Sequence, residues 1–171
     1  MNNSKTMIDL RLLKKIFILQ DLSDNELEQV LAATRPHSVP AQNIVMTEGE
    51  PGEVMYIMCE GEVEITKRLV LQFDDGVPRD KVMIRLKADD GVIFGEMALI
   101  DNDVRSATVT ALTDCRLLEL GKDRFYELVH QNPKMGIKIL WRLSQMLSQR
   151  LRQTGNEVVK LTTALAIALE A

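Results

Sequence analysis

Residues 91–109 read GVIFGEMALIDNDVRSATV, and Gly95, Glu96 and Arg105 in this run suit the binding of a small anion. Glycine lets the backbone turn tightly at position 95, so residues 96–100 can form a short helical turn whose unpaired amides favour a negative group. Arg105 can return to the same point, where its planar fork of donors fits two phosphate oxygens. An ionised glutamate is an acceptor that suits a sugar hydroxyl. The run predicts a site for a phosphorylated ribose; the alternative is a surface ion pair between Glu96 and Arg105 beside a tight turn.

Short apolar or alternating runs, separated by glycines and acidic turns, fill the chain from Val39 to Leu120. This pattern is typical of β-strands, and many short strands indicate a barrel or roll. The segment Leu69–Lys81 contains turn-forming residues and is predicted to be a long, exposed hairpin connection. The predicted strands are Asn43–Met46, Val54–Cys59, Glu62–Arg68, Val82–Leu86, Ser106–Ala111 and Cys115–Leu120.

Helices are predicted on both sides of this β region, which makes the fold class α+β. Apolar residues recur every three or four positions in the first segment, and Ser23 stands three residues before Glu26, the spacing of a helix capping box. The chain from Met135 to Ala171 holds no proline and is predicted to be one long helix or a broken pair. The other predicted helices are Lys5–Gln20, Asp24–Thr34 and Lys122–Gln131.

The last segment repeats mostly apolar residues with alternating spacings of three and four, the a/d pattern of a coiled coil. The positions are Ile137, Leu140, Ser144, Leu147, Leu151, Thr154, Val158, Leu161, Leu165 and Ala168. Such a stripe favours a partner helix, and we expect a homodimer. We divide the chain into a roll with N-terminal helices, residues 1–133, and a C-terminal coiled-coil-like helix, residues 134–171.

Composition excludes several classes of protein. With 171 residues, 46% of them hydrophobic and 27% charged, the chain fits one globular domain. Its net charge of −4 disfavours DNA or RNA binding, and the +4 of residues 134–171, six basic minus two acidic side chains, fits a solvated coiled-coil flank better. No apolar run approaches the roughly 20 residues that cross a bilayer, so we expect no membrane contact and a cytoplasmic protein.

The cysteines and histidines do not predict a metal centre. Cys59 and Cys115 lie in apolar, strand-like stretches outside any metal-ligand pattern, and we interpret both as core thiols. His37 and His130 are isolated in the sequence, which is too few imidazoles for a metal site built on two or three of them. A metalloenzyme is therefore disfavoured.

The run from residue 94 to residue 109 closely resembles the phosphate-binding cassette of the cyclic nucleotide-binding domain family, which has the form FGE-[LM]-AL-I, a short variable loop, then R-[AST]-A-T-V. Segments nearer the N-terminus, Glu48–Gly52, Met55–Met58 and Gly61–Ile65, resemble the early strands and turn glycines of the same family. The resemblance covers about residues 10 to 155.

This resemblance implies a β-roll of the jelly-roll type, flanked by helices, with a cyclic nucleotide inside. The cyclic phosphate would lie against Arg105, and Glu96 would accept the ribose 2′-hydroxyl. Ile65 would line the apolar wall beside the base. Backbone amides would complete the phosphate cradle, and a hydroxyl at Ser106 would add a hydrogen bond; the residues implied for this cradle are Gly95, Glu96, Met97, Ser106 and Ala107.

The segment from residue 142 to residue 154 resembles the long dimer helix of the bacterial catabolite activator proteins. Aligned without gaps, Thr154 falls where those proteins place a threonine that contacts adenine. The serine that follows it there, and that reaches the base in the other subunit, is replaced by Gly155, so half of the adenine contact is missing. The resemblance favours cAMP over cGMP. Those activators continue into a helix-turn-helix domain, whereas this sequence stops at Ala171.

We expect a non-enzymatic sensor that binds a cyclic nucleotide and signals through its C-terminal helix to a protein effector not identified by the sequence. Two alternatives stay open. One is a dimerisation or interaction module with the family fold and no physiological nucleotide. The other is the sensor part of a truncated transcription regulator. Enzymatic activity is the least favoured, because catalytic proteins of related barrel folds use clustered histidines, which this sequence lacks.

Overall fold

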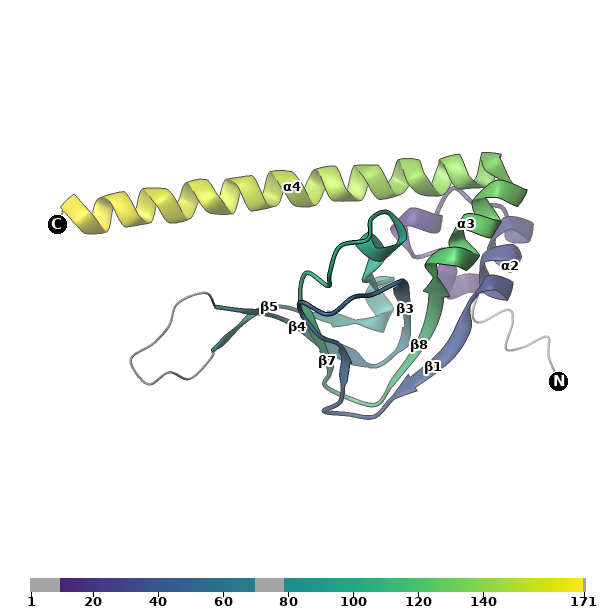
Figure 1. Ribbon diagram of the computed structural model, residues 1–171, viewed down its shortest axis with the longest axis horizontal. Helices are drawn as coiled ribbons and strands as arrows, with labels where there is room; N and C mark the ends of the chain where they lie inside the picture. Colours follow the sequence, from purple (N-terminus) through teal and green to yellow (C-terminus); the bar gives the residue numbers. More distant parts are fainter. Residues whose placement is uncertain (1–9, 70–78, 171) are drawn as a thin grey trace.

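The computed structural model describes residues 10–69 and 79–170, and its elements are labelled in Figure 1. The helical elements are η1 (Phe17–Leu19), α2 (Asp24–Ala33), η2 (Ala88–Asp90), η3 (Glu96–Leu99), α3 (Lys122–Gln131) and α4 (Pro133–Glu170). The strands are β1 (Arg35–Val39), β2 (Ile44–Met46), β3 (Val54–Glu60), β4 (Glu62–Arg68), β5 (Asp80–Lys87), β6 (Ile93–Phe94), β7 (Thr108–Ala111) and β8 (Cys115–Gly121).

The strands form two four-stranded sheets, in the orders β1-β8-β3-β6 and β2-β7-β4-β5. Every pairing in both sheets is antiparallel. The two sheets close into a β-roll, with α2, α3 and the first half of α4 gathered at one end (Figure 1). The prediction of an α+β fold, a roll with N-terminal helices and a long C-terminal helix, is confirmed.

Strand β3 is buried on both faces, which explains its unbroken apolar sequence. Side chains alternate across a strand, so Met55 and Ile57 join one hydrophobic cluster with residues of the helices, whereas Tyr56 and Met58 join a second cluster inside the roll. Strand β8 alternates in the same way. The sheet that contains β3 therefore separates a helical core from the core of the roll.

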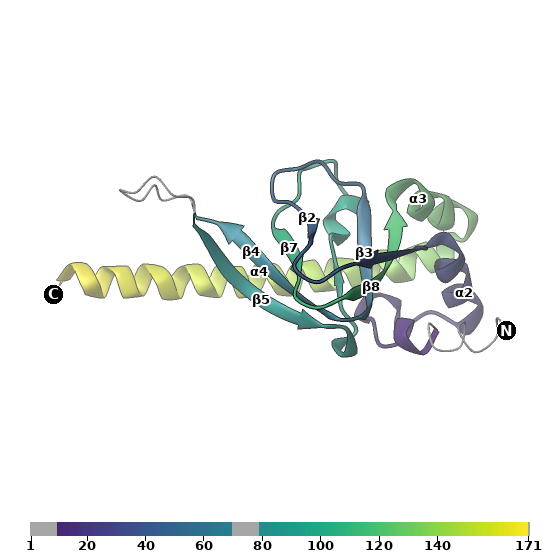
Figure 2. The same cartoon turned by 90° about the horizontal axis from the view of Figure 1, so that it is seen from below.

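Helix α4 is 38 residues long and passes through Gly155 without a break, which settles the choice between one helix and two. Its first half packs against α3 and η1, whereas residues 148–169 are exposed and run past the roll (Figures 1 and 2). Within residues 10–69 and 79–170, no helix combines the length and the hydropathy needed to cross a membrane.

The opening segment and the first strand differ from the prediction. Residues 10–13 are helical but a turn at residues 14–15 ends that helix, so Lys5–Gln20 is not continuous; residues 5–9 lie outside the described residues. The break lets Ile16, Ile18 and Leu19 all be buried, which a single helix face cannot do. Strand β1 was not predicted because it contains Pro36, and it is tolerated there because β1 is an edge strand.

Other strands also differ from the prediction. Strand β7 begins at Thr108, so Ser106 and Ala107 form a bend before it instead of the start of the predicted strand. Strand β5 is longer than the predicted Val82–Leu86, and β6 was not predicted. The predicted connection Leu69–Lys81 falls mainly on residues 70–78, outside the described residues, and its last two residues belong to β5.

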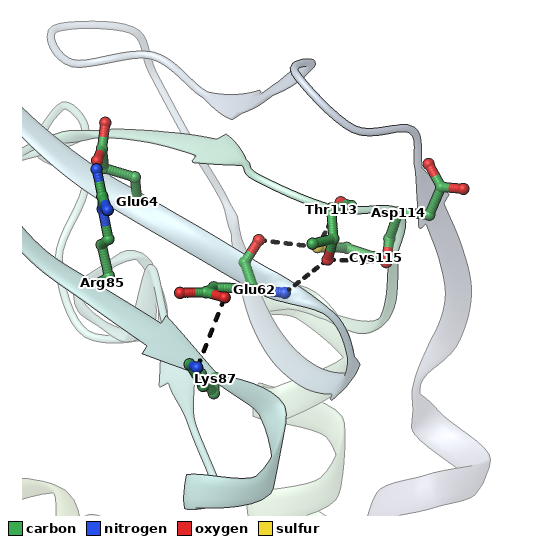
Figure 3. A network of polar contacts seen from close by, with 7 residues as sticks. All are labelled: Glu62, Glu64, Arg85, Lys87, Thr113, Asp114 and Cys115. Carbon is green, nitrogen blue, oxygen red and sulfur yellow. Dashed lines mark hydrogen bonds and ion pairs between the residues drawn. The ribbon is translucent and has the colours of Figure 1, made fainter.

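Polar contacts hold the β4–β5 hairpin on its outer face (Figure 3). Glu64 pairs with Arg85 across the two strands at 2.8 Å, and Glu62 pairs with Lys87 at 3.8 Å. Beside them the Glu62 amide donates to Thr113 Oγ1 at 3.0 Å. Because side chains alternate, the opposite face of the hairpin is turned toward the interior of the roll.

Cys59 and Cys115 are not joined by a disulfide bond. Cys115 is buried, and burial raises the pKa of its thiol. Cys59 is half-buried and packs against the helical core.

Candidate functional site

A cavity of about 270 Å³ lies between η3, the inner face of the β4–β5 hairpin and α4. Most of the residues predicted for the site line it. Those are Ile65, Gly95, Glu96, Met97, Arg105 and Ser106. Its apolar wall consists of Met46, Ile65, Ile84, Leu86, Ile93 and Phe94. The cavity therefore combines one apolar side with one side that carries both a cation and a carboxylate.

Gly95 forms the turn that starts η3. Its φ of +72° lies in the left-handed region, and a Cβ there would stand 2.7 Å from Arg105 Nη1 and 3.0 Å from the Val54 carbonyl oxygen. The first hydrogen bond of η3 runs from the Ala98 amide to the Gly95 carbonyl. The amides of Glu96 and Met97 come before it in the chain and therefore have no acceptor within η3. Only glycine fits this position, because both the backbone angle and the nearby guanidinium exclude a side chain.

Arg105 is 8% exposed and lies across two glycines. Its Nη1 donates to the carbonyl oxygens of Val54 at 2.8 Å and Gly95 at 3.4 Å. A Cβ on Gly52 would stand 2.0 Å from Arg105 Nε, so the guanidinium packs directly against the Gly52 backbone. The guanidinium carbon also lies 5.9 Å from the centre of the Tyr56 ring. In the described part of the chain, the hydrogen bonds of this side chain all start from Nη1, which leaves donors on Nε and Nη2 for a ligand.

The backbone of Arg105 is fixed by a turn that lies far away in the sequence. The Arg105 amide donates to the Glu50 carbonyl at 2.8 Å, and the Gly49 amide donates to the Arg105 carbonyl at 2.9 Å. Pro51 forms an isolated bridge with Val104 beside them. The predicted turn at residues 48–52 thus supports Arg105 in two ways: its backbone forms hydrogen bonds with the Arg105 backbone, and Gly52 packs against the Arg105 guanidinium.

Glu96 is 2% exposed and is paired with a residue that was not predicted. Its Oε1 accepts a hydrogen bond from Nη1 of Arg150, which extends from α4 to the wall of the cavity. The side chain of Glu96 is 3% exposed and that of Arg150 is 50% exposed. The only sequence signal for Arg150 is its place one helical turn before Thr154.

Two predicted site residues do not line the cavity. Ala107 is buried in the bend between Arg105 and β7. Thr154 is exposed on α4, one turn beyond Arg150 and on the same face of the helix. Residues that the prediction missed are Gly52, Val54, Tyr56 and Arg150.

Tyr56 is enclosed between aromatic and charged neighbours. Its ring stacks on Phe94, with the ring centres 5.3 Å apart, and burial raises the pKa of its hydroxyl group. Because this ring forms part of the roll core, it gives the guanidinium of Arg105 a fixed surface.

Among residues 10–69 and 79–170, no cluster of histidine, cysteine and acidic side chains has the composition to hold a metal ion. The chemistry of the cavity is instead that of a site for a small polar anion with an apolar part. A buried guanidinium recognises phosphate oxygens, and a buried carboxylate accepts from a hydroxyl.

Comparison with known proteins assigns the family. The family "Cyclic nucleotide-binding domain" matches residues 36–132, which include β2 to β8, η3 and all of β1 except its first residue. Of the elements that line the cavity, only α4 lies outside the matched residues. The chain belongs to the cyclic nucleotide-binding domain family.

Individual relatives come from two kinds of protein. The cAMP-dependent protein kinase regulatory subunit of Yarrowia lipolytica is 37% identical over 117 residues, which are 68% of this chain and 28% of that protein. The cAMP-activated global transcriptional regulator CRP of Pasteurella multocida is 30% identical over 139 residues, which are 81% of this chain and 61% of that protein. This chain thus spans less than two thirds of the length of these relatives.

A solved structure has the same fold over nearly the whole chain. The crystal structure of a cyclic nucleotide-binding domain from Methylobacillus flagellatus KT superposes with a TM-score of 0.74 and 28% identity, covering 92% of this chain and 84% of that one.

Proposed function

We propose that this chain is a non-enzymatic sensor that binds cAMP in the cavity beside η3 and signals through α4. In this proposal residues 1–133 form the binding unit, residues 134–171 form the output helix, and the protein acts in the cytoplasm. One observation carries the proposal: Arg105 and Glu96, 8% and 2% exposed, both line one cavity whose other wall is apolar.

Each part of a cyclic nucleotide has a counterpart in the cavity. The free donors of Arg105 suit the cyclic phosphate, together with the amides of Glu96, Met97 and Ser106, which line the cavity and are outside strand pairing. The amide of Ala107, in the bend next to the lining, would complete this cradle. The second oxygen of Glu96 is available to the ribose 2′-hydroxyl, because Arg150 contacts the first. The base would lie against Ile65, Ile84 and Leu86.

The choice of cAMP over cGMP rests on relatives and on one helix position. The names of both curated relatives include cAMP. Thr154 follows Arg150 by one turn, so it lies on the same face of α4 as Arg150, which lines the cavity. Gly155 offers no hydroxyl, which makes cGMP the alternative ligand to test.

Signalling through α4 is supported by contacts at both ends of its first half. Arg142 makes two hydrogen bonds of 2.7 Å to Asp21, and Lys138 pairs with Glu26 at 2.8 Å. Further along the helix, Arg150 contacts Glu96 inside the cavity. A ligand that changes the surroundings of Glu96 therefore acts directly on the helix and shifts how it packs.

The exposed apolar residues of α4 support a homodimer. Leu151, Val158, Leu161 and Leu165 are 56–74% exposed and occupy a/d positions of one stripe. A second copy of α4 would cover this stripe and bring the two cavities into one assembly.

One observation favours the second candidate, an interaction module without a physiological nucleotide. The Arg150–Glu96 pair already gives the buried carboxylate a cationic partner from the same chain. If Glu96 serves only this ion pair, it takes no part in binding ribose, and the fold serves dimerisation alone.

Titration calorimetry with cAMP, cGMP and AMP separates the two candidates. We expect micromolar or tighter binding of cAMP, weaker binding of cGMP and none of AMP. Arg105→Ala should weaken cAMP by about 100-fold, because it removes several charge-assisted hydrogen bonds, whereas Arg152→Ala on exposed α4 should not. No heat with any cyclic nucleotide would favour the interaction module.

A further inference from the structure

The loop at residues 100–104 joins the two groups of the site, because it leads from η3, which carries Glu96, to Arg105. Residues 101–104 are exposed and belong to no helix, and their side chains pack into no core cluster. Short-range bonds within the loop include Val104 amide to Asp103 Oδ1 at 2.8 Å and Asp101 amide to the Met97 carbonyl at 3.1 Å. Such bonds shape the loop but do not fix residues 101–103 relative to the rest of the roll, whereas Val104 is held by its bridge with Pro51.

Lys122, the first residue of α3, contacts this loop from outside. Its Nζ donates to the Asp101 carbonyl oxygen at 2.5 Å and to Asn102 Oδ1 at 2.7 Å. The ammonium also lies 5.9 Å from the centre of the Tyr126 ring, one turn along α3. Lys122 as a whole residue is half-exposed, and both hydrogen bonds are formed by its charged ammonium on the exposed side of the contact.

The backbone of Lys122 is tied to the residue just before strand β3, whose first residue, Val54, holds the arginine side chain. The Lys122 amide donates to the Glu53 carbonyl at 2.8 Å, and the neighbouring Val54 carbonyl accepts from Arg105 Nη1. Lys122 thus contacts the loop before Arg105 through its ammonium, and the start of β3, beneath the guanidinium, through its backbone amide. Lys122 spans the two and closes a ring of contacts around the arginine.

We propose that Lys122 is a positioning residue of the ligand site, which holds the loop 100–104 so that Arg105 and Glu96 face one ligand at the same time. This rests on the proposed function, since the ligand is the cyclic nucleotide. Lys122 does not line the cavity, and it acts through the loop. Because α3 packs against α4, the same contact also links the loop to the helical end of the molecule.

The charge of Lys122 offers a competing explanation that experiment can separate. Asp101 and Asp103 line the cavity, and a nearby ammonium reduces their repulsion of an anionic ligand. A through-space effect between exposed charges weakens strongly with added salt. A positioning effect persists, because the hydrogen bonds fix geometry.

The test compares Lys122→Met, Lys122→Arg and the control Lys134→Met in the full chain. Methionine keeps the apolar stem against Tyr126 and removes the donors, whereas Lys134 is an exposed lysine at the start of α4 and gives the same change of charge. Affinities for cAMP and 2′-deoxy-cAMP are measured by calorimetry at low and high salt. Hydrogen exchange of the amides of residues 101–104 and the melting temperature are recorded for each ligand-free protein.

We expect Lys122→Met to weaken cAMP and 2′-deoxy-cAMP by a similar factor of about ten, equivalent to about 1.4 kcal/mol, at both salt concentrations. Exchange at residues 101–104 should accelerate while the melting temperature changes little, Lys122→Arg should recover most of the affinity, and Lys134→Met should match the wild type. Unchanged affinity in Lys122→Met, or a loss that vanishes in high salt, overturns the proposal. If the wild type binds no cyclic nucleotide, the proposed function fails, and unchanged exchange in Lys122→Met would separately show that the lysine does not hold the loop.

Discussion

Arg150, near the middle of α4, forms an ion pair with Glu96, the first residue of η3, across 54 positions of the chain. This contact places a side chain of the long helix in the wall of the cavity. It also gives the buried carboxylate a partner, without which a charge that is 3% exposed would be strongly unfavourable. The helix and the ligand site are therefore connected by one charged pair.

A double-mutant cycle should detect this pair in the free energy of unfolding. We expect Arg150→Met to lower stability by about 1 kcal/mol, a modest value because the arginine is half-exposed. In a Glu96→Gln background the same change should cost much less, since no buried charge is left unpaired. Urea unfolding of the four proteins gives the coupling, with Arg152→Met as a control on the same helix. Strictly additive effects would mean that the pair contributes nothing in solution.

The ribose role of Glu96 predicts a selective loss of affinity. Glu96→Gln removes the charge that strengthens a hydrogen bond from the 2′-hydroxyl, so cAMP should bind about ten-fold more weakly. The affinity for 2′-deoxy-cAMP should change far less, because that ligand lacks the hydroxyl. Calorimetry with both ligands measures the ratio. Equal losses would assign Glu96 a purely structural role.

Gly52 should be as important to binding as a charged residue, although it has no side chain. Gly52→Ala would bring a Cβ to 2.0 Å from Arg105 Nε and displace the guanidinium. We expect cAMP affinity to fall by about ten-fold or more, with the folded state retained in circular dichroism. Gly121→Ala is the matched control, because a Cβ there meets nothing within 4 Å. Wild-type affinity in Gly52→Ala would show that Arg105 does not need its observed position.

Glu26 should contribute to stability in a pH-dependent manner. Hydrogen bonds from Lys138 and from the Ser23 amide hold the pKa of Glu26 below its ordinary value of 4.5. The folded state therefore binds the proton less readily than the unfolded state, and the stabilisation present above pH 4.5 is lost as the pH falls through the lower, folded value.

Glu26→Gln should accordingly be less stable than the wild type by about 1 kcal/mol at pH 7, and the difference should shrink below pH 4.5. Glutamine at this position can still cap α2, so the comparison isolates the charge. Unfolding by urea at several pH values measures it, with Glu28→Gln, an exposed glutamate of the same helix, as control. A difference that is independent of pH would contradict the ion pair with Lys138.

The a/d stripe of α4 predicts the effect of charge on assembly. Leu151→Glu with Leu161→Glu should give monomers in light scattering, because both positions lie on the expected seam and neither contributes to the core of the chain. Val159→Glu with Ile167→Glu adds the same charge at exposed positions off the stripe and should leave a dimer. Monomers in the control pair, or a dimer in the stripe pair, would place the interface elsewhere.

Local patterns in the sequence account for much of this fold. Three features depend only on neighbours within a few positions and can therefore be recognised in the sequence. They are the capping box at Ser23 and Glu26, the strands flanked by turn glycines, and the a/d repeat of α4. The run around Gly95, Glu96 and Arg105 belongs to the same category, because nine residues of chain suffice to bring the carboxylate and the guanidinium together.

Contacts between distant segments followed no local pattern and depended on the packing of the whole chain. Gly52 and Val54 beneath Arg105 are about 50 positions away from it, and Arg150 meets Glu96 only because α4 is packed across the helical end of the roll. Strand β1 was not predicted because it contains Pro36. Proline has no N–H to donate, so it is tolerated in a strand only at a sheet edge, where no second neighbouring strand needs that donor. The sequence therefore specifies which groups could bind a phosphorylated ribose, whereas the sheet pairings and the course of α4 determine which side chains surround them, since such contacts form only after distant segments have packed together.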